Sequence, residues 1–306
     1  MRPRVPAILV LATALAVLPS AGCSIRRLAV TKLGDALAES GTAYASDDDP
    51  ELIREAMPFT LKLIESILDQ NPRHSGLLTA AAGGFTQYAW AFVQQDADEI
   101  EDTDLARARD LRIRARNLYL RAHRYGVRGL EIAHAGFGAM LGADSKAAAL
   151  MTTAHDLPLL YWTAASLLAS ISLSKDDPER IAELPVVDAL MARALALDPD
   201  YSHGALHELM ISYEAGRTDA MGGSAARARG HFKRAMELSG GMRASPLVSL
   251  AEMVSVRDQN RPEFQTLLNQ ALAVDPNARP EWRLENLLMQ RRARWLLARV
   301  DLLFAE

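Results

Sequence analysis

Two histidines and a glutamate are the side chains in this sequence that come nearest to the spacing of a metal site. His203 and His207 are four residues apart, with Glu208 beside the second. Residues at this spacing share one face of a helix, where two neutral imidazoles could hold a metal ion. No third ligand is evident, because Glu208 points about a quarter of a turn away. We therefore interpret the histidines as packed within the fold, with metal binding as the alternative.

The motifs of several common enzyme classes are missing from the sequence. It contains no Gly-rich phosphate loop followed by Lys, no Gly-x-Ser-x-Gly elbow and no His-Glu-x-x-His zinc motif. The isolated pairs Gly83-Gly84 and Gly222-Gly223 are expected to mark helix starts or close helix contacts rather than a ligand cradle. We predict a protein that is not an enzyme and needs no cofactor.

Cys23 is the only cysteine, and it follows a segment typical of an export signal. Two arginines precede an apolar run of 12 residues, 7–18, which is shorter than the ~20 residues that a membrane span needs. The small residues Ser20-Ala21-Gly22 then form a lipobox-like site, although bacterial lipoproteins more often have Leu at the position of Ser20. We predict a signal peptide over residues 1–22 and acylation of Cys23, with an incidental thiol as the alternative.

An acylated Cys23 would attach the protein to a membrane through lipid alone, because each buried methylene contributes ~0.8 kcal/mol. A single cysteine forms no internal disulfide, so the exported body must fold without one. Ser24 follows the cysteine where inner-membrane lipoproteins of proteobacteria usually have Asp. We expect a periplasmic protein anchored to the outer membrane, with residues 23–50 forming the acylated N-terminus, a linker and a first helix.

The charge of the mature chain argues against a nucleic-acid partner. Loss of the two leader arginines leaves 32 basic and 38 acidic residues, a net charge of −6 on 284 residues. An acidic, exported body is poorly suited to binding a polyanion. The composition, 49% hydrophobic and 24% charged, is that of an ordinary folded protein.

Apolar residues recur every three or four positions, as helices require, and no run alternates as a strand would. One such row is Leu52, Ala56, Phe59, Leu63 and Ile67. Prolines interrupt these rows at regular intervals, for example at Pro72 and Pro199, where a helix must stop. The sequence therefore predicts an all-α fold.

Four stretches end alike, in an apolar pair followed by a proline or glycine: Ile64–Pro72, Ala194–Pro199, Ala235–Gly240 and Ala271–Pro276. Ala194 and Ala235 are 41 residues apart, and Ala271 follows after 36 more. This period is close to that of tetratricopeptide-like repeats, whose hairpins must stack to cover their apolar faces. We predict a solenoid of tetratricopeptide-like helical hairpins over residues 51–306, with a generic helical bundle as the alternative.

Charged residues cluster in three runs. Six acidic residues lie between Asp96 and Asp104, and eight arginines follow between Arg107 and Arg128. The acidic group suits the positive end of a helix. A solvated face is the first interpretation of these runs, and a docking surface for a partner protein is the alternative. The C-terminal arginines are interpreted in the same way: Arg291, Arg292, Arg294 and Arg299.

Four segments together resemble the TatT family of TRAP-transporter-associated lipoproteins: Gly83–Phe92, Asp156–Asp176, Gly222–Gly241 and Asn286–Ala298. The resemblance extends over nearly the whole mature chain. It implies a periplasmic lipoprotein with tetratricopeptide-like hairpins that assembles as a homotrimer with a pore. It also implies pairing with the solute-binding protein of a tripartite ATP-independent periplasmic (TRAP) transporter, and a role in handling small hydrophobic ligands.

No catalytic residues come with this resemblance, so ligand or partner residues are proposed from side chains on the first helix of each expected hairpin, which usually lines the concave surface of such arrays. These are Phe85, Gln87, Tyr88, Phe92, Tyr161, Trp162, His207 and Tyr213. Core packing is the first interpretation of the aromatic residues, and a concave apolar groove is the alternative. The leading hypothesis is an accessory lipoprotein for solute uptake, and the rival is a scaffold lipoprotein that binds no small molecule.

Overall fold

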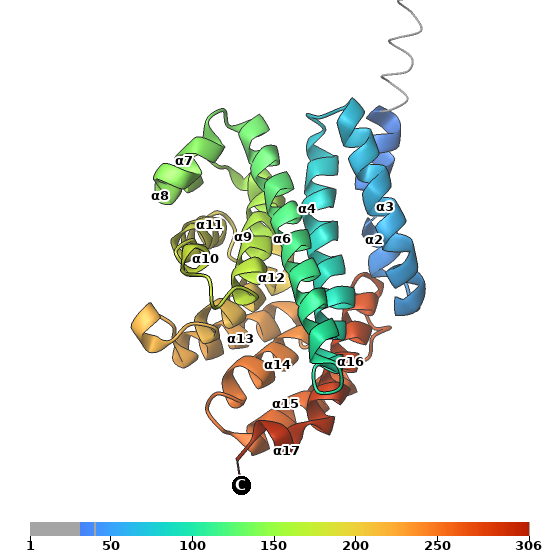
Figure 1. Cartoon of the computed structure of the whole chain (residues 1–306), viewed down its shortest axis with the longest axis vertical. Helices are drawn as coiled ribbons and strands as arrows, with labels where there is room; N and C mark the ends of the chain where they lie inside the picture. Colours follow the sequence, from blue (N-terminus) through green and yellow to red (C-terminus); the bar gives the residue numbers. More distant parts are fainter. Residues whose placement is uncertain (1–30, 40, 306) are drawn as a thin grey trace, which may run out of the picture.

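The computed structural model describes residues 31–39 and 41–305, and these form helices and turns with no β-strand among them (Figure 1). The all-α class predicted from the sequence is thereby confirmed. Cys23 and the segment expected to be a signal peptide lie outside the described residues. In the part of the chain that is described, no helix combines the length and the apolar character that crossing a membrane needs.

The N-terminal part consists of long helices packed side by side (Figure 1). A helix at 31–38 precedes them, and α4 continues into α5 through the π-helical turn η1. The elements are α2 (Gly41–Ala45), α3 (Pro50–Gln70), α4 (Ser75–Ala89), η1 (Trp90–Gln94), α5 (Gln95–Ile100) and α6 (Leu105–Ala133). Helix α4 packs between α3 and α6 and also contacts α9, so its buried side chains form the centre of this part.

The middle of the chain packs helix α11 on α9, which in turn lies against α6. Its elements are α7 (Phe137–Ala143), α8 (Ser145–Leu150), η2 (Ala154–Asp156), α9 (Leu157–Ser172), α10 (Pro178–Ile181) and α11 (Leu184–Leu197). A second apolar cluster fills the space between them, with Leu160 and Leu190 fully buried.

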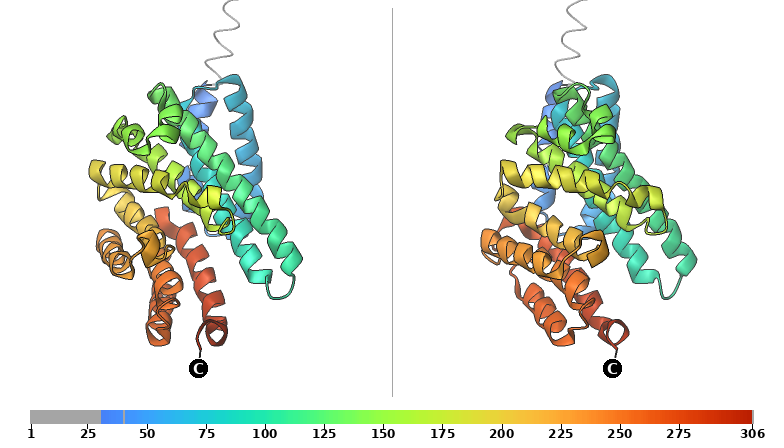
Figure 2. Two further views of the ribbon diagram at one scale, coloured as in Figure 1. Left: turned by 60° about the vertical axis from the view of Figure 1, so that its left-hand side comes forward. Right: turned by 90° about the vertical axis from the view of Figure 1, so that its left-hand side faces the viewer.

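The C-terminal part again consists of packed helix pairs, α12 with α13 and α15 with α16. Its elements are α12 (Tyr201–Ala215), η3 (Asp219–Met221), α13 (Ala225–Ser239), α14 (Ser245–Leu250), η4 (Ala251–Ser255), α15 (Arg261–Ala273), η5 (Pro280–Trp282), α16 (Arg283–Ala298) and α17 (Val300–Leu303). In both views of Figure 2 the chain passes from the N-terminal helices at the top to the C-terminal helices at the bottom.

Local sequence explains where many helices begin and end. The carboxylate of Asp49 accepts hydrogen bonds from the backbone N–H groups of Glu51 and Leu52 and so caps α3, whose first residue is a proline. Asp104 caps α6 in the same way. The four stretches with similar endings lie at the C-terminal ends of α3, α11, α13 and α15. These boundaries follow from residues within a few positions of each helix end.

Glycines allow α9 to approach both α4 and α6 closely. A Cβ on Gly126 of α6 would collide with the side chain of Thr163, and one on Gly83 of α4 would lie 2.9 Å from the ring of Trp162. Gly83 was expected to mark a close helix contact, and it does. Helices α4, α6 and α9 are therefore tightly packed together, and they carry the surface side chains described below.

The six acidic residues between Asp96 and Asp104, here called the acidic run, hold the C-terminal helix α16 against the N-terminal part. Arg291 of α16 pairs with Glu99 at 2.7 Å and with Asp96 at 3.4 Å. Arg292 pairs with Asp98 at 3.0 Å, and Arg299 pairs with Asp102. The acidic run and most of the C-terminal arginines thus neutralise each other, which differs from the solvated face expected from their sequence.

Candidate functional site

Three aromatic residues of the proposed set lie together between α3 and α6. Phe85 and Tyr88 project from α4, and Phe92 projects from η1, one helical turn further on. All three are buried, with exposed fractions of 3%, 8% and 3%. Tyr88 and Phe92 contact each other, with ring centroids 5.8 Å apart. These rings form the floor of a surface between the two flanking helices, α3 and α6, whose ribbons lie on either side of α4 in Figure 1.

Each of these rings has a guanidinium group over its face, supplied by a neighbouring helix. The three pairs are Arg54 over Phe92 at 5.0 Å, Arg114 over Tyr88 at 5.8 Å and Arg121 over Phe85 at 5.3 Å. The ring quadrupole attracts a cation in this position, so the stacking restricts where each arginine can lie. Arg114 also donates a hydrogen bond to the Tyr88 hydroxyl, over 3.4 Å. The outer surface of the aromatic floor is therefore cationic.

The arginines of α6 form a continuous surface along the helix. Steps of seven residues return to nearly the same helix face, so four of them form a row. Together with the neighbouring Arg124, we call this set the arginine face: Arg107, Arg114, Arg121, Arg124 and Arg128. Two shallow depressions of about 350 and 400 Å³ adjoin it, and Arg114 lines both of them.

Most of the α6 arginines have no carboxylate to neutralise them within the described structure. Of the eight, only two form ion pairs there, Arg112 with Asp98 and Glu101, and Arg121 with Glu65. Arg128 instead donates to the carbonyl oxygen of Pro72, over 2.6 Å. The acidic run that precedes α6 in sequence pairs with Arg54, with Arg112 and with the C-terminal arginines Arg291, Arg292 and Arg299, so the arginine face keeps an excess of positive charge.

A second group of proposed residues lies on α9, beside a buried charge cluster. Tyr161 and Trp162 contact each other edge to face at 4.7 Å, and burial raises the pKa of Tyr161 above its ordinary value. The Nη2 atom of Arg243 lies 2.9 Å from a carboxylate oxygen of Glu208 and 2.8 Å from one of Glu285. Burial raises the pKa of Glu208 to about 7. One guanidinium thus serves two carboxylates, one of which gains a proton readily.

The remaining proposed residues do not join either group. The Nδ1 atoms of His207 and His231 are 2.8 Å apart, and burial lowers the pKa of both imidazoles. Tyr213, only 2% exposed, packs under Arg217 with the guanidinium 3.7 Å from the ring centroid. Gln87 is exposed on α4. The structure therefore separates these three from the aromatic floor.

The three side chains first considered as metal ligands point to three different partners. His203 contacts the ring of Trp282, His207 contacts His231, and Glu208 pairs with Arg243. Ser202, His203 and Gly204 have positive φ angles, so the start of α12 is not a regular helix and the spacing of four does not align the imidazoles. Among the described residues, no three His, Cys, Asp or Glu side chains are grouped so as to hold a metal ion.

Two features of the candidate site, the arginine face and Arg243, were missed or only partly found from the sequence. The run of arginines on α6 was visible, and its spacing of seven could have identified the arginine face. Arg243 lies in a turn between α13 and α14, where no periodic pattern marks it. The aromatic floor was found, but nothing in the sequence indicated that arginines would cover it.

The sequence is similar to known proteins over most of its length. The TRAP transporter T-component family matches residues 46–304. An uncharacterized protein of Treponema pallidum (strain Nichols) is 29% identical over 304 residues, which cover 94% of this chain and 94% of that protein. The family match extends from before α3 to the end of α17, so it includes the arginine face and the C-terminal helices.

Proposed function

Since the chain belongs to the TRAP transporter T-component family, we propose that it is the accessory lipoprotein of such a transporter and that it binds the transporter's solute-binding protein. The family is that of a transport accessory component and not a known enzyme family. The match over residues 46–304 is the observation that carries this proposal, because it spans every helix from α3 onward. The large cationic surface on α6 supports a role in docking another protein.

The test is to isolate the acylated protein with its partners from its native envelope. Photo-crosslinking from surface positions, followed by mass spectrometry, should recover a solute-binding protein encoded beside a TRAP permease. Recovery of other envelope proteins alone, at every crosslinker position, would refute the proposal. A cysteine-free Cys23→Ser variant separates the effect of the anchor from that of the binding surface.

We propose further that residues 1–22 are a signal peptide and that acylated Cys23 attaches the protein to the periplasmic side of the outer membrane. The apolar run at 7–18, the small residues before Cys23 and Ser24 after it support this assignment. The anchored protein would then have its helical domain, residues 51–306, free in the periplasm. The intact mass of the wild type should equal that of residues 23–306 plus the acyl groups, the Cys23→Ser variant should lack these groups, and only the wild type should sediment with outer membranes.

The helical domain is proposed to be a tetratricopeptide-like solenoid. Packing of α9 with α11, of α12 with α13 and of α14 with α15 supports this proposal, as do the contacts that α12 makes with α9 and α14. We propose a homotrimer on the resemblance to the TatT family. Sedimentation equilibrium of the acyl-free domain measures the oligomeric state directly, and a monomer at all concentrations would exclude the trimer.

A small hydrophobic ligand belongs to the same proposal, with Tyr161 and Trp162 as its candidate contacts because both are partly exposed. The rival function, a scaffold lipoprotein without a ligand, is supported by the low exposure of Phe85, Tyr88 and Phe92. Native mass spectrometry of gently purified protein distinguishes the two. A bound apolar molecule supports ligand handling, whereas an empty protein that still retains its partner supports the scaffold.

A further inference from the structure

Positive charge on the arginine face contrasts with the net negative charge of the chain. The whole sequence carries a formal charge of −4. Four of the five arginines on this face, all except Arg121, have no carboxylate partner among the described residues. The nearest acidic segment in sequence pairs instead with arginines outside this face, namely Arg54, Arg112, Arg291, Arg292 and Arg299. An uncompensated row of this kind is electrostatically complementary to an acidic surface.

Two side chains of the arginine face are also held in a defined conformation. Arg114 and Arg121 lie over the rings of Tyr88 and Phe85, which limits their side-chain freedom before any partner arrives. Ordering a long side chain at an interface costs about 0.5–1.5 kcal/mol of conformational entropy. Stacking on a ring reduces the entropy that such a side chain still has to lose on binding. The guanidinium group of arginine binds a carboxylate through two parallel hydrogen bonds. Arginine is also frequent among the residues that dominate the affinity of protein interfaces. These properties suit protein docking.

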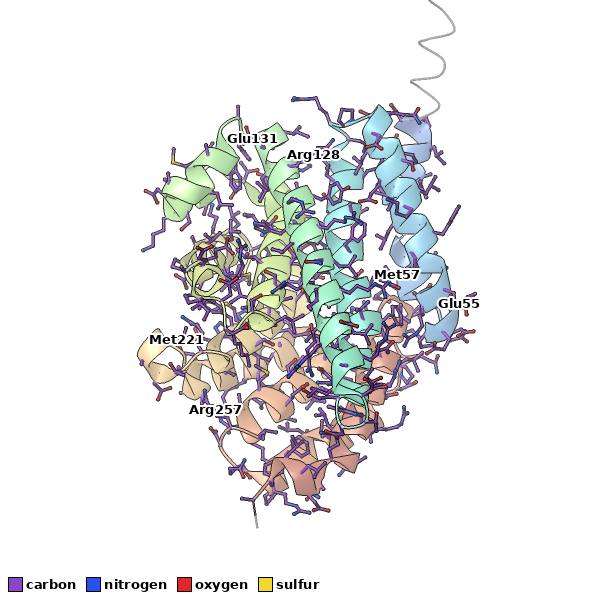
Figure 3. All side chains as sticks on the ribbon, viewed as in Figure 1. Glu55, Met57, Arg128, Glu131, Met221 and Arg257 are labelled. Atoms are coloured by element: carbon purple, nitrogen blue, oxygen red, sulfur yellow. The ribbon has the colours of Figure 1, made fainter. Side chains whose placement is uncertain are left out.

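The direction of the row favours a protein over a membrane as its partner. Arg128, labelled near one end of α6 in Figure 3, donates to the carbonyl of Pro72 in the turn between α3 and α4. Gly34 in the first described helix lies against His74 in the same turn, so the chain enters the domain at this end. The row from Arg107 to Arg128 is about 32 Å long. The row therefore extends away from the end where the chain enters the domain. Its charges do not all lie at the same distance from a membrane at that end.

We propose that the arginine face docks an acidic surface of the transporter's solute-binding protein. The inference rests on the proposed function, because it assigns the place on this chain where that partner binds. The carboxylates of the partner would pair with the unneutralised guanidinium groups, and the aromatic floor would keep Arg114 and Arg121 in position. The attraction should accelerate association and weaken as salt screens it.

Charge reversal on the two sides of α6 tests the proposal with matched variants. Arg107→Glu with Arg124→Glu alters the arginine face, at two positions whose side chains form no hydrogen bond among the described residues. Arg109→Glu with Arg116→Glu makes the same charge change about half a turn around α6 from Arg107, also at side chains that form no hydrogen bond among the described residues. Both variants should retain the wild-type circular dichroism and melting temperature, since three of the four side chains are exposed and Arg116 is half-buried.

The measurement is the affinity of the full-length protein for the purified solute-binding protein, at about 50 and 300 mM NaCl. We expect the first variant to bind at least ~30-fold more weakly, the control within ~3-fold of the wild type, and the wild type to weaken with salt. Equal affinity of both variants and the wild type, or equal loss in both, would overturn the proposal. No wild-type binding at either salt concentration would refute the proposed function itself.

Two further measurements exclude other occupants of this face. Flotation with vesicles of anionic phosphatidylglycerol tests a lipid surface, and sedimentation of each variant without the partner tests a second copy of this chain. Loss of vesicle binding or of self-association in the first variant alone, with partner affinity unchanged, would assign the arginine face to that occupant and overturn protein docking. Unchanged sedimentation and vesicle binding, together with the lost affinity, is the supporting result.

Discussion

At the scale of single residues, the group around Arg243 is where the chemistry of the interior is least ordinary. Its guanidinium contacts carboxylate oxygens of both Glu208 and Glu285, and the Ser245 hydroxyl donates a hydrogen bond to Glu285 over 2.5 Å. Burial raises the pKa of Glu208 to about 7 in spite of the neighbouring arginine. Two carboxylates close to one cation cannot both be fully compensated, and the more buried of them takes up a proton.

The stability of the protein should therefore depend on the ionisation of Glu208. The pKa of Glu208 in the folded protein lies above its ordinary value of 4.5. The contribution of this group to the free energy of unfolding is therefore complete below about pH 4.5 and is lost as the pH rises through about 7. We expect the wild type to lose on the order of 2 kcal/mol of unfolding free energy between pH 5 and 8 through this group, and Glu208→Gln to lose much less. Urea titrations at several pH values measure this. The exposed Glu55→Gln is the control, and parallel profiles for all three proteins would contradict the assignment.

At the scale of elements, the close crossing of α6 and α9 determines how rigidly the arginine face is supported. The Cβ that Gly126 lacks would overlap the Thr163 side chain and approach its backbone, so the helices can be this close only with glycine there. The same layer carries Gly83 against Trp162. Small residues at a helix crossing thus have a geometric role that outweighs the low helix propensity of glycine.

Two glycine-to-alanine substitutions should have opposite effects. Gly126→Ala should destabilise the protein by about 1–3 kcal/mol, because α9 must shift to make room for the methyl group. Gly142→Ala in α7, where a Cβ meets nothing within 4 Å, should instead stabilise it by up to about 1 kcal/mol. Thermal unfolding of both variants measures the difference. A stabilising Gly126→Ala substitution would mean that the two helices are not in close contact.

At the scale of the whole molecule, ion pairs join the N-terminal part to the C-terminal helices. The partners lie in or just after α5 and α16 and are 192 to 197 residues apart in sequence. Arg292 is central, with its side chain 8% exposed and 3.0 Å from Asp98, and it also pairs with Glu252 of η4. Burial raises the pKa of Asp98 despite the two arginines beside it, which shows how strongly this junction is shielded from water.

Removal of Arg292 should destabilise the protein far more than removal of its neighbour Arg294. Arg292→Ala leaves Glu252 without its cation and Asp98 with Arg112 alone, and removal of one partner from a buried ion pair costs about 3–5 kcal/mol. Arg294 is exposed, and Arg294→Ala should change stability by less than about 0.5 kcal/mol. Denaturant unfolding gives both values, and hydrogen exchange should show faster opening of α16 only in the first variant. Similar values for the two variants would argue against a shielded junction.

Several features could be predicted from the sequence alone because their causes are local. Amphipathic spacing predicts the all-α class, and residues such as Asp49, Asp104 and Pro178 mark helix starts through capping and through the fixed proline φ. The four similar endings likewise coincide with helix ends. The aromatic candidates on α4 were identified by the same periodicity, although their burial under arginines was not.

Only the tertiary structure decided what these residues face. Arg291 and Arg107 occur in similar arginine runs, yet one is neutralised by the acidic run and the other is left unpaired. An ion pair between residues almost two hundred positions apart leaves no periodic signal, because it depends on how the helices meet. The positive φ angles at Ser202 and His203 also broke a spacing that the sequence implied. Local sequence determines which segments are helical, whereas charge compensation and surface exposure depend on long-range packing.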